Sequence, residues 1–119
     1  MEQCKRLIFI TTTFEGTHRY DGAPDEVSYL RFPHRHMFGV KVTMEVFHDD
    51  REVEFILLKH AVNSFIQEQF CGDNAALSCE MMADTIRNYL LEKYPHRRIA
   101  VEVNEDNENG AIIGFFAQI

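Results

Sequence analysis

The chain has 119 residues, 45% of them hydrophobic and 26% charged, with a formal net charge of −7 at neutral pH. This length fits one domain with one core, spanning residues 1–119, and the composition excludes a disordered chain. The acidic balance argues against a general nucleic-acid binder, which would carry a basic surface.

The three cysteines Cys4, Cys71 and Cys79 form neither an even set nor a Cys-x-x-Cys motif. This pattern predicts no disulfide framework and favours the reducing cytoplasm. Residues 1–6 are too short and too polar to open a signal peptide, and no apolar run approaches the length of a membrane span. We therefore expect a cytoplasmic domain without a membrane partner.

The first half of the chain predicts two strands separated by a long loop. Residues 7–14 are rich in β-branched and aromatic side chains, which favour a strand. Residues 15–33 hold two glycines and two prolines among scattered charges, and loops of this length tend to be functional. Residues 38–48 alternate between apolar and polar side chains, which predicts the second strand.

The second half predicts two helices and two strands. Apolar residues recur at helical spacing over residues 53–69, and Ser78 is a suitable N-cap for a second helix that stops before Pro95. A third strand starts at Ile99, and Asn109-Gly110 predicts a hairpin turn into a fourth strand over 111–116. The order ββααββ predicts an α+β domain, with a four-stranded antiparallel sheet and both helices on one face.

A pair of histidines stands at the start of the second strand. Because successive strand side chains point to opposite faces, His34 and His36 share the apolar face of Phe38. Neighbouring imidazoles on a buried face suit a divalent metal. With His18, which follows the first strand, three histidines would leave zinc an open fourth position, as in catalytic sites. The alternative is that these rings only pack or cap strand ends.

Glu105 interrupts the apolar pattern of the third strand. It continues the odd-numbered face of Ile99, Val101 and Val103. A carboxylate at the end of an apolar face is either a solvated strand end or a contact for a ligand.

Five segments occur in an order that a known family shares. They are Phe-Glu-Gly-Thr-His-Arg (14–19), Pro-His-Arg-His-Met-Phe (33–38), Val-Glu-Phe-Ile-Leu-Leu-Lys (53–59), Leu-Ser-Cys-Glu (77–80) and Val-Glu-Val-Asn-Glu-Asp (101–106). The set resembles the family of 6-pyruvoyl-tetrahydropterin synthase and 6-carboxytetrahydropterin synthase, which has the tunnelling fold. The resemblance covers nearly the whole chain.

The resemblance implies roles for the residues at these motifs. His18, His34 and His36 take the places of the zinc ligands, and Glu105 takes the place of the carboxylate that anchors the pterin ring. A carboxylate can accept two parallel N–H bonds from a 2-amino-pyrimidinone. The family also implies a homo-oligomeric barrel, commonly a hexamer, with sites at subunit interfaces. Such assembly would cover the strand edges and the second face of the sheet.

Two parts of the family's proton relay are missing from this sequence. The family's catalytic cysteine lies six positions before the first histidine of the pair, where this chain has Ser28, and a hydroxyl is far less acidic than a thiol. The family's Asp-His pair has no equivalent histidine in residues 65–74. Cys71 in that segment is a speculative substitute, although a cysteine at a helix end is usually inert.

We therefore expect a zinc-dependent lyase acting on 7,8-dihydroneopterin triphosphate or a related pterin. The 6-carboxytetrahydropterin branch, which feeds 7-deazaguanine and queuosine synthesis, fits so compact a chain somewhat better than the pyruvoyl branch. The alternative is a non-catalytic or divergent homologue that binds a pterin or purine without the cysteine and histidine relay. A third alternative is an oligomeric structural domain with surface histidines.

Overall fold

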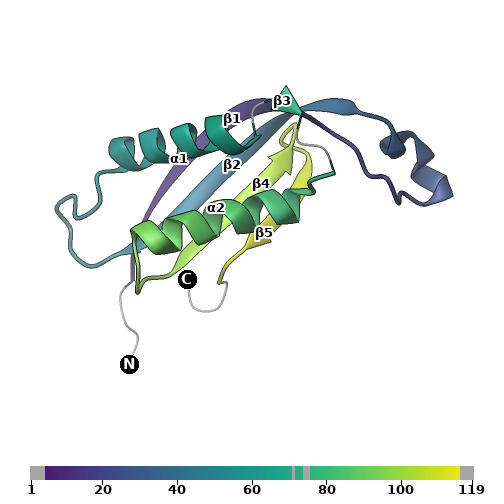
Figure 1. The fold of residues 1–119 in the computed structure, drawn as a ribbon. Helices are drawn as coiled ribbons and strands as arrows, with labels where there is room; N and C mark the ends of the chain where they lie inside the picture. The colour runs from purple at the N-terminus through teal and green to yellow at the C-terminus, as the bar shows by residue number, and fades with distance from the viewer. Residues whose placement is uncertain (1–4, 71, 74–75, 116–119) are drawn as a thin grey trace.

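The chain folds into an open antiparallel sheet covered by helices on one face (Figure 1), in a computed structural model that describes residues 5–70, 72–73 and 76–115. Four strands lie side by side in the order β1 (Arg6–His18), β2 (His34–Val46), β4 (Ile99–Glu105) and β5 (Asn109–Ile113). Each neighbouring pair is antiparallel. The predicted α+β class and four-stranded antiparallel sheet are confirmed.

The predicted order ββααββ is incomplete, because two short elements interrupt it. The described helices are the 3-10 helix η1 (Asp25–Arg31), α1 (Phe55–Phe70) and α2 (Cys79–Lys93). Helix η1 lies between β1 and β2, and the two-residue strand β3 (Gly72–Asp73) lies between α1 and α2 and pairs in parallel with β1. Within the described residues, no helix combines the length and the apolar character that crossing a membrane requires.

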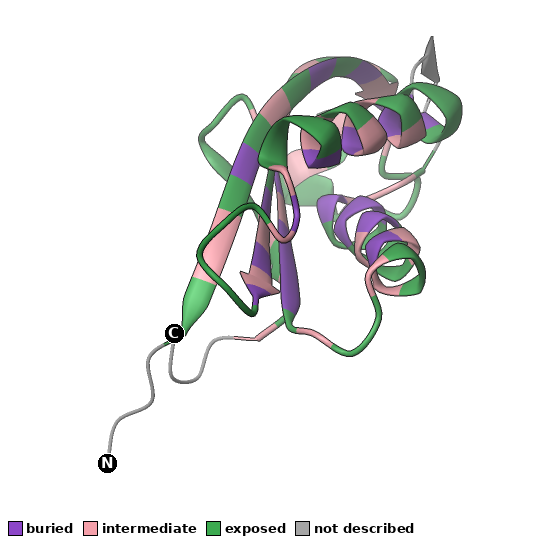
Figure 2. Ribbon diagram, turned by 90° about the vertical axis from the view of Figure 1, so that its left-hand side faces the viewer, coloured by how far each residue is buried: buried purple, intermediate pink, exposed green. Residues whose placement is uncertain are grey.

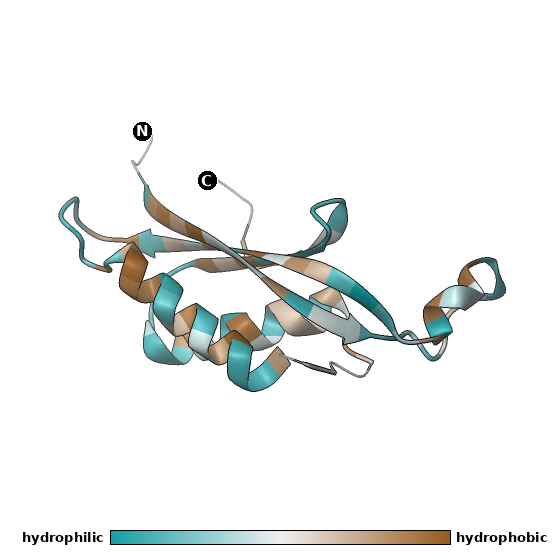
Figure 3. Ribbon diagram, turned by 90° about the horizontal axis from the view of Figure 1, so that it is seen from above, coloured by the Kyte–Doolittle hydropathy of each residue, from teal (hydrophilic) through white to brown (hydrophobic). Residues whose placement is uncertain are grey.

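One face of the sheet, here called the inner face, is covered by both α1 and α2 (Figure 3). The buried positions of the helices are turned toward this face (Figure 2). The buried residues of each helix repeat at helical spacing, and the buried residues of the sheet alternate along each strand. Each element therefore buries the apolar side chains that its sequence pattern predicts. The core includes Leu58, Val62 and Ile66 of α1, Met82, Ile86 and Leu90 of α2, and Val42, Met44 and Val101 of the sheet.

Strands β1 and β2 are longer at their joined ends than the sequence predicts. Strand β1 continues to His18 instead of ending at residue 14, and β2 begins at His34 instead of residue 38. The added residues pair with one another, from Glu15 opposite Met37 to His18 opposite His34. In this extension each strand supplies hydrogen-bond partners for the backbone of the other. This pairing, and not the local composition around Gly16, therefore decides where the two strands end.

The predicted Asn109-Gly110 turn is wrong, because both residues already belong to β5. The chain reverses three residues earlier, at Asp106 and Asn107, whose φ angles are 55° and 61°. Asp and Asn tolerate this left-handed conformation better than most residues. Gly110 is needed for a different reason, since a Cβ there would lie 2.2 Å from the carbonyl oxygen of Val103.

Two adjacent leucines of α1 test this packing. Leu58 is fully buried, whereas Leu57 is 64% exposed. We expect Leu58→Ala to lower the free energy of unfolding by about 2–5 kcal/mol, because it removes transfer energy and leaves a cavity. Leu57→Ala should change it by less than about 0.5 kcal/mol. Urea unfolding followed by circular dichroism measures both, and equal losses would contradict the assignment of the buried helix face.

Candidate metal centre

Three histidines converge on the inner face, at the end of the sheet from which the 19–33 segment extends (Figure 1). His18 is the last residue of β1 and lies directly opposite His34, the first residue of β2. His36 lies two residues further along β2 and therefore points to the same face as His34. The prediction that the paired histidines share the face of Phe38 is confirmed.

The three rings are close enough to serve one metal ion. Their centroids are 4.6 to 5.3 Å apart. Each ring offers one nitrogen, and these nitrogens all lie within 4.8 Å of one another. Two imidazole ligands of one zinc ion are at most about 4.2 Å apart, since each Zn–N bond is about 2.0–2.1 Å. Three ligands at ordinary coordination angles are about 3–4 Å apart, so side-chain shifts of about 1 Å bring the nitrogens to bonding distance of a common ion.

Hydrogen bonds hold each ring by its Nδ1 atom. The acceptors are the carbonyl oxygen of Leu77 (2.7 Å from His18), the carbonyl oxygen of Phe32 (2.9 Å from His34) and Oδ2 of Asp106 (2.7 Å from His36). A carbonyl oxygen only accepts, so Nδ1 of His18 and Nδ1 of His34 must carry the proton. In the neutral ring the lone pair is then on Nε2, which is the protonation state that a metal ligand needs.

The Nε2 atoms are the unsatisfied ends of these rings. Nε2 of His18 and Nε2 of His36 are buried and have no hydrogen-bond partner. The edges of both rings pack against Phe38, at centroid distances of 5.2 and 5.6 Å. A buried polar atom without a partner is costly. A divalent cation bound among the three rings would supply the missing partner, so the donor set fits a metal.

Glu105 reaches the same cluster from β4. It pairs with Phe38 across the strands, which places its side chain on the inner face beside His36. Its Oε2 atom lies 3.1 Å from Nε2 of His18 and 3.7 Å from Nε2 of His36. Of the two alternatives for Glu105, this position favours a contact for a ligand, since its side chain is 26% exposed and lies beside two of the histidines.

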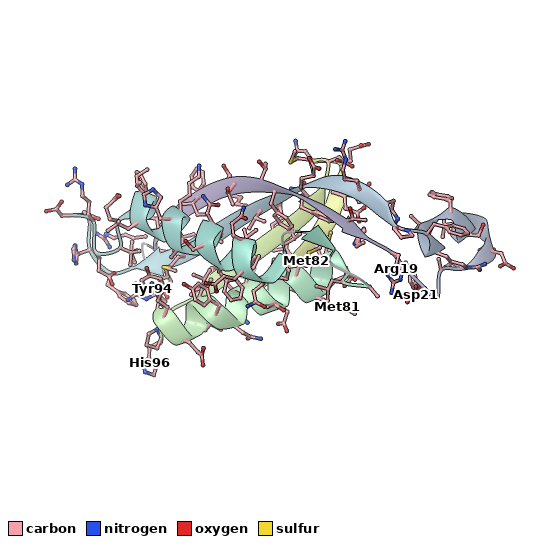
Figure 4. All side chains as sticks on the ribbon, turned by 45° about the horizontal axis from the view of Figure 1, so that its top comes forward. Arg19, Asp21, Met81, Met82, Tyr94 and His96 are labelled. Carbon is pink, nitrogen blue, oxygen red and sulfur yellow. The ribbon has the colours of Figure 1, made fainter. Side chains whose placement is uncertain are left out.

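A pocket of about 630 Å³ opens beside the cluster. The pocket is lined by His18, His34 and Glu105. It is also lined by residues from the 19–33 segment, the start of α2 and the start of β5. Figure 4 shows Arg19 and Asp21 at the same end of the molecule as Met81, with Tyr94 and His96 at the other end of α2. Ser78 caps α2 as predicted, and its Oγ accepts a hydrogen bond from the Met81 backbone N–H at 3.1 Å.

Cys79 lines this pocket, although its position in the sequence indicated no role beyond its place in a motif. Burial, and then the negative charge of Glu105, raises the pKa of the Cys79 thiol to about 12. The thiol is therefore protonated at neutral pH and does not act as a ready nucleophile or base. Its place on the first turn of α2 was readable from the sequence, but its proximity to the histidine site depends on how α2 packs on β4.

Ser28 and Cys71 are the two positions considered for the proton relay. Ser28 is exposed on η1 and is not among the residues that line the pocket. Cys71 lies outside the described residues. The arginines near the histidines are held by local ion pairs, Arg19 to Asp21 at 2.9 Å, Arg31 to Asp25 at 2.9 Å and Arg35 to Glu15 at 3.2 Å.

Asp106 belongs to the candidate site, although the sequence did not single it out. Its Oδ2 accepts the His36 hydrogen bond, and its Oδ1 accepts the backbone N–H of Met37 at 2.9 Å. These two bonds, the one from His36 first, hold the pKa of the Asp106 carboxyl below its usual value. The signal available in the sequence was its position directly after Glu105, in a turn whose left-handed conformation favours Asp.

Comparison with known proteins adds no relative to this picture. No protein-family model matches the chain, and no curated protein matches it. A function for this protein is therefore inferred from the geometry of the histidine site and from the sequence motifs.

Asp106→Asn tests whether the hydrogen bonds behind the rings matter for metal binding. One amide oxygen cannot replace both carboxylate oxygens, so His36 or Met37 loses its acceptor while the turn keeps a residue that tolerates positive φ. We expect zinc affinity to fall about 10- to 100-fold, as measured by competition with a chromophoric chelator. Glu108→Gln, exposed in the same turn, is the matched control. Unchanged affinity in Asp106→Asn would show that His36 needs no such support.

Proposed function

We propose that this protein is a zinc-dependent pterin-processing protein, similar to 6-carboxytetrahydropterin synthase. The observation that carries the proposal is the convergence of three imidazoles whose Nδ1 atoms are all held, so that their Nε2 atoms face one another at the mouth of a pocket. Such a set leaves room for a further ligand on the metal, which is typical of catalytic zinc sites. The motif order that resembles the pterin synthases supplies the substrate class.

The pocket supports a small heterocyclic ligand. A volume of about 630 Å³ lies within the range of about 300–1,000 Å³ for small-molecule sites. Leu30 and Leu77 offer apolar contacts to such a ring, and Glu105 offers a carboxylate. We propose that Glu105 accepts the N–H groups of the 2-amino-4-oxo edge of a pterin or a purine-like ring.

The chemistry divides between the metal and the chain. When bound, zinc would act as a Lewis acid toward an oxygen of the substrate side chain. His18, His34 and His36 hold the ion, and Glu105 orients the ring. Proton transfer needs a group with a pKa near the working pH. Ser28 is exposed on η1, and Cys79 has a pKa of about 12, so neither is suited to this task.

A second candidate function is therefore a divergent pterin or purine binder with slow turnover or none. The observation that favours it is the same absence of a suited base at Ser28 and Cys79. We propose that pterin binds while the standard pyruvoyl or carboxy reaction is slow or absent. Rapid turnover would show that another group carries the proton.

The binding test compares two pteridines on zinc-loaded protein. Pterin presents the 2-amino-4-oxo edge, whereas lumazine has an oxygen in place of the 2-amino group. We expect lumazine to bind at least about 100-fold more weakly, because it removes a donor and places an oxygen against the Glu105 carboxylate. Fluorescence titration measures both affinities, and chromatography of products from 7,8-dihydroneopterin triphosphate measures turnover.

Two histidine variants complete this test. His34→Ala should lose zinc and pterin binding together, because one of three ligands is removed. His60→Ala, at an exposed position of α1, should retain both. Equal affinity for pterin and lumazine would contradict recognition of the amino edge. A wild-type protein that binds neither zinc nor pterin would contradict the proposal as a whole.

We also propose that the chain assembles as a homo-oligomer, as a hexameric barrel by analogy with the pterin synthases. The support is the outer face of the sheet, which lies opposite α1 and α2. Phe9 is 61% exposed and Ile112 is 45% exposed there, beside a shallow hollow of about 330 Å³. Strand β5 also presents an unpaired edge within the described sheet. Exposed apolar sheet surface of this kind invites association.

The assembly is tested by placing a charge on each face of the molecule. Phe9→Glu should shift the protein to a smaller species in light scattering coupled to gel filtration, because a buried carboxylate opposes the interface. Ile56→Glu, at a 50% exposed apolar position of α1, should leave the assembly intact. A wild-type monomer at micromolar concentration would contradict the proposal.

A further inference from the structure

Glu105 is closer to the histidines than a group that only anchors a substrate needs to be. Its Oε2 atom lies 3.1 Å from Nε2 of His18 and 3.7 Å from Nε2 of His36. The pairing of Glu105 with Phe38 fixes this placement, because His36 lies two residues before Phe38 on the same face. Asp106, the next residue, binds Nδ1 of His36 at 2.7 Å. Two consecutive carboxylates therefore contact the two nitrogens of one ring.

A hydrogen bond from a protonated ring does not explain the contact between Glu105 and His18, because Nε2 of His18 has no hydrogen-bond partner although Oε2 of Glu105 lies 3.1 Å away. Nδ1 of His18 donates to a carbonyl oxygen, so Nε2 of the neutral ring carries a lone pair. Carboxylate oxygens also present lone pairs, and two such atoms repel one another at 3.1 Å. Moreover, Nε2 of His18 and Nε2 of His36 are both buried without a hydrogen-bond partner, although Glu105 is beside them. A cation among these atoms would turn the repulsion into attraction.

The separations agree with ligands of one ion. Bonds of about 2.0–2.2 Å to nitrogen and carboxylate oxygen, at ordinary coordination angles, place two ligands about 3–4 Å apart. Both measured distances, 3.1 and 3.7 Å, lie within that interval. The side chain of His18 is 8% exposed and that of Glu105 is 26% exposed, so water competes little for the inner side of the contact.

We propose that Glu105 is itself a metal ligand, so that three histidines and one carboxylate hold the ion before a substrate arrives. This inference rests on the metal centre of the proposed function and adds a second role to Glu105. An incoming heterocycle meets a carboxylate that is already bound. Glu105 would exchange its contact with the ion for the N–H groups of the ring, which would leave a coordination position for an oxygen of the substrate. Substrate entry and the opening of the coordination site are thereby coupled.

The test uses cobalt-loaded protein without any pterin, so that substrate recognition does not enter the result. We expect Glu105→Gln to weaken Co²⁺ and Zn²⁺ binding by at least about 10-fold in chelator competition, and to change the visible d–d absorption bands of bound Co²⁺. Glu102→Gln, on the same strand but on the outer face, is the matched control and should change neither. Circular dichroism confirms that each variant is folded.

Glu105→Asp separates direct ligation from a mere effect of charge. It keeps the negative charge but shortens the side chain by one methylene, so a ligand contact is lost while the charge near the ion remains. We expect the d–d bands and the affinity to change as in Glu105→Gln. Bands and affinity that match the wild type in Glu105→Asp would overturn the inference, as an effect of charge alone, and leave the three-histidine centre standing. A wild-type protein that takes up neither ion would overturn the inference and the metal-dependent function together.

Discussion

Strands β1 and β2 pair along their whole length, from Arg6 opposite Val46 to His18 opposite His34. This ladder brings the end of one strand and the start of the next to the same point, and the two-residue repeat of a strand turns their histidines to one face. A slip of one residue would move His34 and His36 to the outer face and bring Arg35 inward. The buried run from Phe38 to Val46 prevents that slip, because it would expose the core. The candidate metal centre therefore depends on the register that the core enforces.

The hydrogen bonds behind the rings come from three different parts of the chain. Leu77 precedes α2, Phe32 follows η1, and Asp106 lies in the turn after β4. The sheet places the histidines, but these acceptors select which nitrogen of each ring carries the proton. The left-handed backbone of Asp106 and Asn107 lies at the same place. There Glu105 approaches Nε2 of His18, and the next residue, Asp106, binds Nδ1 of His36. Backbone strain thus coincides with the position where function is proposed.

The pocket brings candidate metal ligands together with a cysteine that is poorly suited to proton transfer. His18, His34 and Glu105 meet in its lining. The cysteine that lines it, Cys79, belongs to the hydrophobic core cluster, and its surroundings favour the neutral thiol. Cys79 therefore offers the candidate site no ready base or nucleophile.

Local patterns in the sequence determined much of this protein. Alternation predicted the faces of β2 and β4, helical spacing predicted α1 and α2, and Ser78 predicted the start of α2. These features depend on residues close in sequence, so periodicity and capping chemistry are sufficient to infer them. The spacing of His34 and His36 belongs to the same class. The ends of β1 and β2, the true turn at Asp106 and Asn107, and the elements η1 and β3 were not predicted.

Only the tertiary structure decided how the parts of the candidate site meet. Contacts between residues 59 and 70 positions apart join His18 to Leu77 and His36 to Asp106, and 87 positions separate His18 from Glu105. No local pattern reports such contacts, because they exist only once β4 has paired with β2 and the start of α2 has reached the end of β1. The sequence therefore identified the ligand types, while long-range packing decided which nitrogen each ring presents and how close the carboxylate stands.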